Sequence, residues 1–163
     1  MSSRVAALLL TCLATACAQP PTQVVVRLAT DLETPTELDA IRLVLLDAEG
    51  EVVREQDLVD FSIPGDGAYH EIGSFGVVPR AADASRRFEV RAQARGAGRE
   101  LFTTRARTGF VSEQTIRLDL YLPASCLTVA VTCQPDETCG VVGCVSPDVD
   151  PRGLPSHAEG APL

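Results

Sequence analysis

The cysteines are the residues of this chain whose spacing most clearly indicates chemistry. Four of the six lie within a span of 19 residues: Cys126, Cys133, Cys139 and Cys144. An even set of closely spaced cysteines predicts two disulfides in an oxidising compartment. Structural zinc is the alternative, but it usually takes cysteine pairs two to four residues apart, and only the last gap is that short. No C-x-x-C sequence supports a redox-active pair. We therefore predict two disulfides, with no metal ion and no cofactor.

The segment 123–146 that holds these cysteines is too short to bury a core of its own. Cross-links must then stabilise it, and each typically contributes about 2–4 kcal/mol. Four cysteines allow three pairings. The segment resembles small growth-factor-like modules, and this resemblance favours the interleaved pairs Cys126–Cys139 and Cys133–Cys144.

The N-terminus carries a second cysteine signal. Arg4 gives a positive start, the apolar run Val5–Leu13 follows, and small residues precede Cys17. This order is typical of a secretory signal, and the run is too short to cross a bilayer core of about 30 Å. The same residues resemble a lipobox, so we expect residues 1–16 to be removed, Cys17 to carry a diacylglycerol, and residues 17–23 to form a linker. Ordinary signal cleavage with free secretion remains the alternative.

Few residues of this chain could serve in catalysis. Only His70 lies within the body of the chain, because His157 falls near the C-terminal end, and there is no lysine. A general base needs a partner and a nucleophile in reach, and no hydrolase, zinc-protease or P-loop motif occurs. We therefore predict no catalytic residue and no enzyme. A sugar platform would need aromatic faces, and the loop Asp66–Tyr69 is the one place to look for it.

The charge distribution argues against nucleic acid as a partner. The net charge is −8, and residues 18–75 hold three arginines against twelve acidic residues. Such a chain cannot neutralise phosphates over a broad surface. The arginines gather later, and four of them would share the polar face of one hairpin: Arg91, Arg95, Arg105 and Arg107. A basic patch is one interpretation of this face, but a solvated face paired with acidic residues is favoured.

These residues must be positioned by strands. Apolar and polar residues alternate with the period of two that predicts β-strands, between turns rich in Gly and Pro. The clearest runs are Val24–Thr30, Ile41–Asp47, 51–59, 88–95, 101–108 and 116–122. One helical turn at most is expected near Thr34–Glu37, where Thr34 could cap it.

The predicted fold class is therefore all-β. Seven or so strands would form a single immunoglobulin-like or prealbumin-like β-sandwich over residues 24–122. The small disulfide-linked module at 123–146 would follow. Residues 147–163 contain Pro, Gly and acidic residues without apolar periodicity, so we predict a disordered tail there.

Several of these features together resemble one family. The lipobox, the segments TDLETPTELDAIRLVLLD and TGFVSEQTIRLDLYL, and the closing cysteine module resemble predicted lipoproteins common in myxobacteria. The resemblance covers nearly the whole mature chain and implies an envelope location with a sandwich-plus-cysteine layout. It brings no assigned activity, so it transfers no functional residue.

The expected function is that of a non-catalytic cell-envelope lipoprotein, a binding or structural module. Its acyl anchor would hold it to a lipid membrane, with the outer membrane favoured, and an envelope protein or cell-wall component would be its partner. A secreted or anchored adhesin-like domain that binds carbohydrate or protein is the alternative. A hydrolase is disfavoured.

Overall fold

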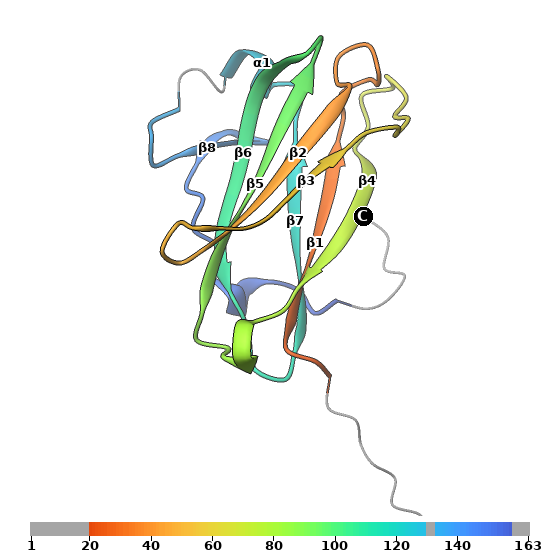
Figure 1. The fold of residues 1–163 in the computed structure, drawn as a ribbon. Helices are drawn as coiled ribbons and strands as arrows, with labels where there is room; N and C mark the ends of the chain where they lie inside the picture. The colour runs from red at the N-terminus through yellow and green to blue at the C-terminus, as the bar shows by residue number, and fades with distance from the viewer. Residues whose placement is uncertain (1–19, 130–132, 158–163) are drawn as a thin grey trace, which may run out of the picture.

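The computed structural model describes residues 20–129 and 133–157. Cys17 and the expected signal segment therefore lie outside the described residues. Strands dominate the described part of the chain and form two packed sheets (Figure 1). The sandwich strands are β1 Gln23–Thr30, β2 Ala40–Asp47, β3 Val52–Leu58, β4 His70–Val77, β5 Arg87–Gly96, β6 Arg99–Gly109 and β7 Thr115–Leu122. The predicted all-β sandwich is confirmed.

The strand order selects between the two sandwich types. One sheet has the order β4-β1-β7, with β1 antiparallel to β4 and parallel to β7. The other has the order β3-β2-β5-β6 and is antiparallel throughout. In the immunoglobulin constant type the first strand pairs with the second in one sheet. Here β1 and β2 lie in different sheets, so the order favours the prealbumin-like alternative.

The core lies between the sheets and follows the alternation in the sequence. Val24, Val26 and Leu28 of β1 are fully buried, as are Val90 and Ala92 of β5 in the facing sheet. Because every second side chain of a strand points to the same face, the polar residues between them face outward. The sequence pattern therefore predicts the inward face of these strands correctly.

Strand β4 is the one sandwich strand that the alternation does not mark. Its pairing with β1 shifts register between Leu28 and Ala29. As a result Ile72 and Phe75, three residues apart, both pack against the core. A β-bulge of this kind breaks the period of two, which hides the strand in the sequence.

The hairpin β5–β6 closes on a two-residue turn. Ala97 and Gly98 both have positive φ, 52° and 75°. A turn of type I′ requires this conformation at both central residues and matches the twist of the flanking strands. This turn joins the two strands that the sequence predicts at 88–95 and 101–108.

The cysteine segment contains the short helix α1 Cys126–Val129 and the hairpin β8 Thr138–Gly140 with β9 Gly143–Val145. Disulfides join Cys126 to Cys139 and Cys133 to Cys144. The favoured interleaved pairing is confirmed, and the bonded sulfur atoms cannot also act as zinc thiolates. Cys126 and Cys139 are 1% and 3% exposed and belong to the core of the sandwich. The module is therefore part of the main fold.

The prediction of a disordered tail is wrong for residues 147–157. The chain there runs along the sandwich and includes the short helix η3 Pro151–Gly153, which Asp150 caps by accepting the N–H of Arg152 at 3.0 Å. Backbone hydrogen bonds to strand edges hold this segment, and such bonds need no apolar periodicity in the sequence. Residues 158–163 lie outside the described residues.

The turn near Thr34 forms, but without the predicted cap. Glu37 donates its N–H to the carbonyl of Glu33 at 2.9 Å, which closes one turn, and its carboxylate accepts the N–H of Glu33 at 2.9 Å. Thr34 instead bonds through its hydroxyl to the carbonyl of Phe61 and the N–H of Ile63, at 3.1 and 2.7 Å. Thr34 therefore fixes the loop after β3.

No helix within the described ranges is long and apolar enough to span a bilayer.

Candidate functional site

The two long sides of the sandwich differ. On the side formed by β6 and β7, the chain covers its own strand edges. The N–H of Arg107 in β6 donates to the carbonyl of Pro147 at 2.7 Å, and that of Val149 returns to the carbonyl of Arg107 at 2.9 Å. On β7, Arg117 donates to Pro155 at 2.9 Å. Exposed edge groups are templates for unwanted pairing, so residues 147–157 protect this side.

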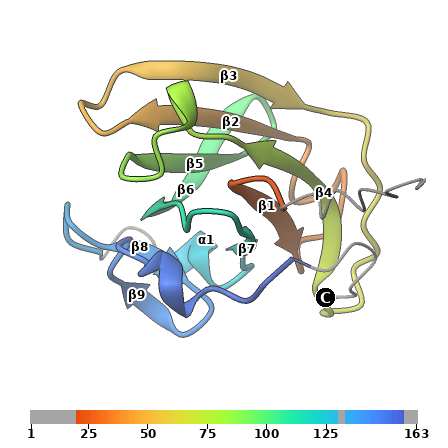
Figure 2. The same ribbon diagram turned by 90° about the horizontal axis from the view of Figure 1, so that it is seen from below.

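The opposite side, between β3 and β4, is open. These strands are the terminal strands of the two sheets, and Figure 2 shows them on the side away from β8 and β9. Six of the seven residues of β3 are exposed. Within the described residues, β3 and β4 each pair with one neighbouring strand only.

A groove runs along this open side. Near the loop after β3 it contains a hollow of about 270 Å³. Apolar side chains from both sheets line it: Leu28, Leu43, Leu58, Phe61, Ile72 and Phe75. Four valines on or next to the edge strands are more than half exposed: Val52, Val53, Val59 and Val78. Val59 lines this hollow, whereas Val53 and Val78 line a second hollow described below. Exposed apolar surface of this kind is typical of a contact site.

Polar residues border the groove on the β3 side. Arg54 donates to the side chain of Gln56 at 2.7 Å, and both line the hollow nearest to Phe75. Glu55 and Asp57 alternate with them and face away from the core, where Arg42 of β2 pairs with them at 2.7 and 3.4 Å. A charged residue that points inward, such as Arg54, discourages indiscriminate strand addition. The groove therefore combines an apolar floor with a polar border.

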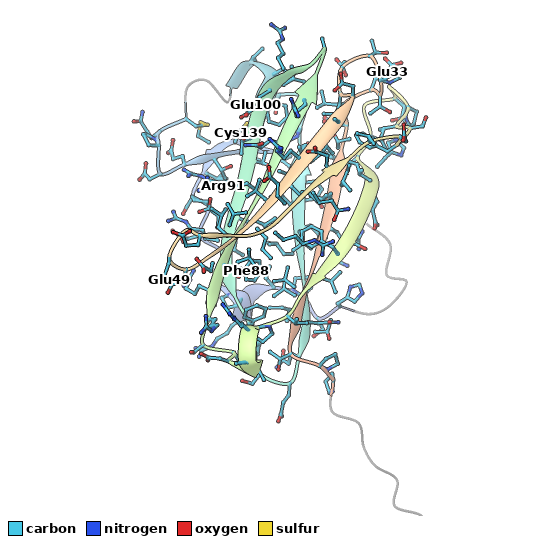
Figure 3. All side chains as sticks on the ribbon, viewed as in Figure 1. Glu33, Glu49, Phe88, Arg91, Glu100 and Cys139 are labelled. Atoms are coloured by element: carbon cyan, nitrogen blue, oxygen red, sulfur yellow. A yellow bond between two sulfur atoms is a disulfide. The ribbon has the colours of Figure 1, made fainter. Side chains whose placement is uncertain are left out.

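At the other end of the open side lies a larger hollow of about 640 Å³. The turn between β2 and β3 and the loop between β4 and β5 enclose it, and Phe88 and Phe110 form part of its floor. Figure 3 shows Glu49 of the turn beside Phe88. Both hollows lie away from the residues that the sequence singled out. Sequence analysis did not find these hollows, because they form beside the strands that end each sheet, and the sequence does not reveal which strands those are.

The loop between β4 and β5 is tightly held. It contains the short helix η1 Arg80–Ala82, in which Ala81 and Ala82 have positive φ, 57° and 56°. Asp83 accepts the N–H and the hydroxyl of Ser85 at 3.0 and 2.6 Å. These hydrogen bonds, and to a smaller extent the charge of Arg86, hold the pKa of the Asp83 carboxyl below its ordinary value. The Asp83 carboxylate therefore fixes this loop.

His70 has a partner, but that partner is a turn residue. The imidazole Nε2 lies 2.9 Å from the carboxylate of Asp66, which also accepts the N–H of Ala68 at 2.9 Å. The hydrogen bond with His70, followed by that from Ala68, lowers the pKa of Asp66. The pair lies on the surface, where the contact orders the turn and gives no sign of activating a nucleophile.

The tyrosine of the same loop packs against a second tyrosine. The rings of Tyr69 and Tyr121 meet edge to face, with centroids 5.1 Å apart. Burial raises the pKa of Tyr69, and the charges of Asp31 and Tyr121 add to the shift. A sugar platform needs an open ring face, and this arrangement commits one ring edge to packing. The loop Asp66–Tyr69 is thus a weaker candidate than the groove.

Three of the four arginines predicted on the face of the β5–β6 hairpin, Arg91, Arg105 and Arg107, have partners. Glu89 bonds with Arg91 and lies 3.8 Å from Arg107, which also reaches Asp148 at 3.3 Å. Arg105 donates to the carbonyls of Pro135 and Glu137. These contacts tie the cysteine segment to the sheet, and they support the interpretation of a paired polar face over that of a basic patch.

No protein-family model, curated protein or solved structure matches this chain. The fold and the site define a prealbumin-like β-sandwich with one side sealed by its own C-terminal segment and one side open. Its function must be inferred from that asymmetry and from the N-terminal sequence.

Proposed function

We propose that this protein is a lipid-anchored binding module of the cell envelope, without catalytic activity. The observation that carries this proposal is the open groove between β3 and β4. Eleven residues of the chain, 147–157, cover the strand edges of β6 and β7 on the opposite side. A side left open and lined by exposed valines is, by contrast, available for another molecule.

The proposed anchor is a lipid attached to Cys17. The described chain is already fixed at Pro21 and Thr22, because Thr115 donates its hydroxyl to the carbonyl of Pro21 at 3.1 Å and the Thr22 hydroxyl accepts the N–H of Glu113 at 2.8 Å. Cys17 and Pro21 are four peptide bonds apart, which spans at most about 14 Å. A lipid on Cys17 would therefore hold the sandwich close to the membrane surface.

The partner that the groove fits is a segment of another envelope protein. Its apolar side chains would enter the hollow beside Ile72 and Phe75. Extended segments commonly bind at open sheet edges, where pockets for alternate side chains give specificity. The side chains of Arg54 and Gln56 at the border would offer this segment hydrogen bonds.

Capture from envelope fractions tests the groove. Val59→Asp places a charge in the groove at a residue that is 56% exposed, so folding should be unaffected. Val142→Asp is the matched control, because Val142 is 89% exposed on the turn between β8 and β9. We expect a partner that the wild type and Val142→Asp retain and that Val59→Asp loses. Equal capture by both variants would contradict the proposal.

A further inference from the structure

The larger hollow has the dimensions of a ligand pocket. It measures about 640 Å³, within the range of about 300–1,000 Å³ typical of small-molecule sites. It lies at the end of the sandwich where β1 begins, because Val77 at the end of β4 pairs with Val24. This places it near Pro21 and Thr22 and away from the groove beside Ile72.

The lining of this pocket is mainly apolar. The rings of Phe88 and Phe110 lie 5.2 Å apart and belong to the buried core. Val53 and Val78 line the pocket and are 62% and 66% exposed. Removing apolar surface from water favours the formation of a complex. An acyl chain would cover the two valines and contact the aromatic floor.

The border of the pocket offers arginines to an anion. Arg80, Arg86 and Arg87 line it from one loop and are all exposed. Arg86 and Arg87 form only long contacts, 3.6 Å to Asp83 and 3.7 Å to Asp148. Exposed ion pairs of this kind contribute little stability. Among the described residues Arg80 has no carboxylate within 4.0 Å.

Three acidic residues line the same border, and two of them, Asp47 and Asp83, are engaged in turns, whereas Glu49 is exposed. Asp47 accepts the N–H groups of Glu49 and Glu51 at 3.1 and 2.9 Å, and Asp83 accepts both bonds from Ser85. The arginines therefore remain the groups best able to bind an incoming anion, which guanidinium recognises through paired hydrogen bonds.

The conformation of the loop adds an independent indication. Ala81 and Ala82 both lie in the left-handed region that non-glycine residues rarely adopt. Such strain persists only where the surroundings impose it and tends to cluster at ligand sites. Here it falls in the loop that presents Arg80 to the pocket.

We propose that this pocket binds an amphiphile composed of an acyl chain and an anionic head group. The chain lies against Phe88 and Phe110, and the carboxylate or phosphate head bonds to Arg80 and its neighbours. The geometry of the pocket alone supports the binding of an amphiphile. Only the source of the ligand rests on the proposed function, because an anchor on Cys17 would hold the pocket near a lipid surface.

Calorimetric titration with dodecanoate tests the pocket. The chain used is Cys17→Ala, which carries no lipid of its own, so a failure of the anchor does not affect the result. We expect saturable binding. Arg80→Gln should weaken it about tenfold or more, since a charge-assisted hydrogen bond contributes about that factor. Val78→Asp should also weaken it about tenfold or more, because it places a negative charge in the apolar lining. Uncharged dodecanol should bind more weakly than dodecanoate and be insensitive to Arg80→Gln.

Matched controls come from the far parts of the molecule. Val142→Asp and Arg99→Gln change an exposed valine and an exposed arginine outside the pocket, and both should bind as the wild type does. Circular dichroism confirms that each variant is folded. Absence of saturable dodecanoate binding, or binding that Val78→Asp and Arg80→Gln leave unchanged, overturns the proposal.

Vesicle flotation then distinguishes the two sources of the ligand. Binding to phosphatidylcholine vesicles that contain phosphatidylglycerol, lost in Arg80→Gln, assigns the pocket to a membrane lipid. Dodecanoate binding without vesicle binding assigns it to a free fatty acid. Loss of groove binding in Val59→Asp would leave both results unchanged, so the two sites are tested separately.

Discussion

At the scale of single residues, the two disulfides differ in what surrounds them. Cys126 and Cys139 lie in the core, whereas Cys133 and Cys144 are only partly buried. Their loops are similar, with sequence separations of 13 and 11, so each bond should restrict the unfolded chain by about 3 kcal/mol. The difference between them must therefore come from packing.

We predict that removing the buried bond costs more. The double variant Cys126→Ala/Cys139→Ala should lose about 1 kcal/mol more than Cys133→Ala/Cys144→Ala, because it also leaves a small void in the core. Urea unfolding followed by circular dichroism measures both. Equal losses would show that Cys126 and Cys139 act as a cross-link only.

Asp83 gives a pH prediction at the same scale. Its pKa is lowered in the folded state, so its hydrogen bonds to Ser85 are present above the ordinary value of 3.8 and are lost as the pH falls through the folded pKa. The amide proton resonance of Ser85 should therefore titrate with a midpoint below 3.8. NMR of the wild type and of Asp83→Asn checks this, since the variant should show no such step. A midpoint above that value would contradict the assigned bonds.

At the scale of elements, the segment 147–157 acts as a cover for two strand edges. Thr108 donates its hydroxyl to the carbonyl of Val149 at 3.0 Å, and the N–H of His157 donates to Thr115 at 2.8 Å. Without these contacts β6 and β7 would expose unpaired backbone groups, which pair readily with other chains.

Ending the chain after Ser146 should therefore promote self-association. We expect size-exclusion chromatography with light scattering to find oligomers that grow with concentration. A chain that ends at His157 is the control and should elute as the full chain does. If the shorter chain eluted as a monomer with unchanged stability, the covering role would be refuted.

The elements also show where sequence patterns succeed and fail. The alternation in β1, β2 and β5 predicts buried residues such as Val26, because every second side chain of these strands points into the core over most of their length. It fails for β4, where the bulge places Ile72 and Phe75 on the same face. It fails again for residues 147–157, which dock through backbone groups that leave no side-chain pattern.

The candidate site was less accessible to sequence reasoning than the fold. Val59 and Phe75 meet at the groove only because β3 and β4 end their sheets on the same side. Strand order depends on long-range pairing, and a single sequence does not encode it in any local period. The disulfide pairs were accessible because four cysteines allow only three pairings and the resemblance to small growth-factor-like modules favoured one of them.

At the scale of the whole molecule, the proposed lipid anchor on Cys17 precedes a sandwich with one open side. The sealed side carries the C-terminal segment, and the disulfide module completes the core. The open side and the pocket at its end face outward. Pro21 and Thr22, which are bonded to the sandwich, lie close to Cys17 in the sequence. The anchor is the premise on which the envelope role depends.

Metabolic labelling with a fatty-acid analogue tests that premise most directly. Cells that express the wild type should yield labelled protein in the membrane fraction, and Cys17→Ala should be unlabelled and absent from that fraction. Cys12→Ala is the matched control and should keep the label, because Cys12 lies in the segment expected to be removed. Label retained by Cys17→Ala, or a wild type without label, would contradict the account.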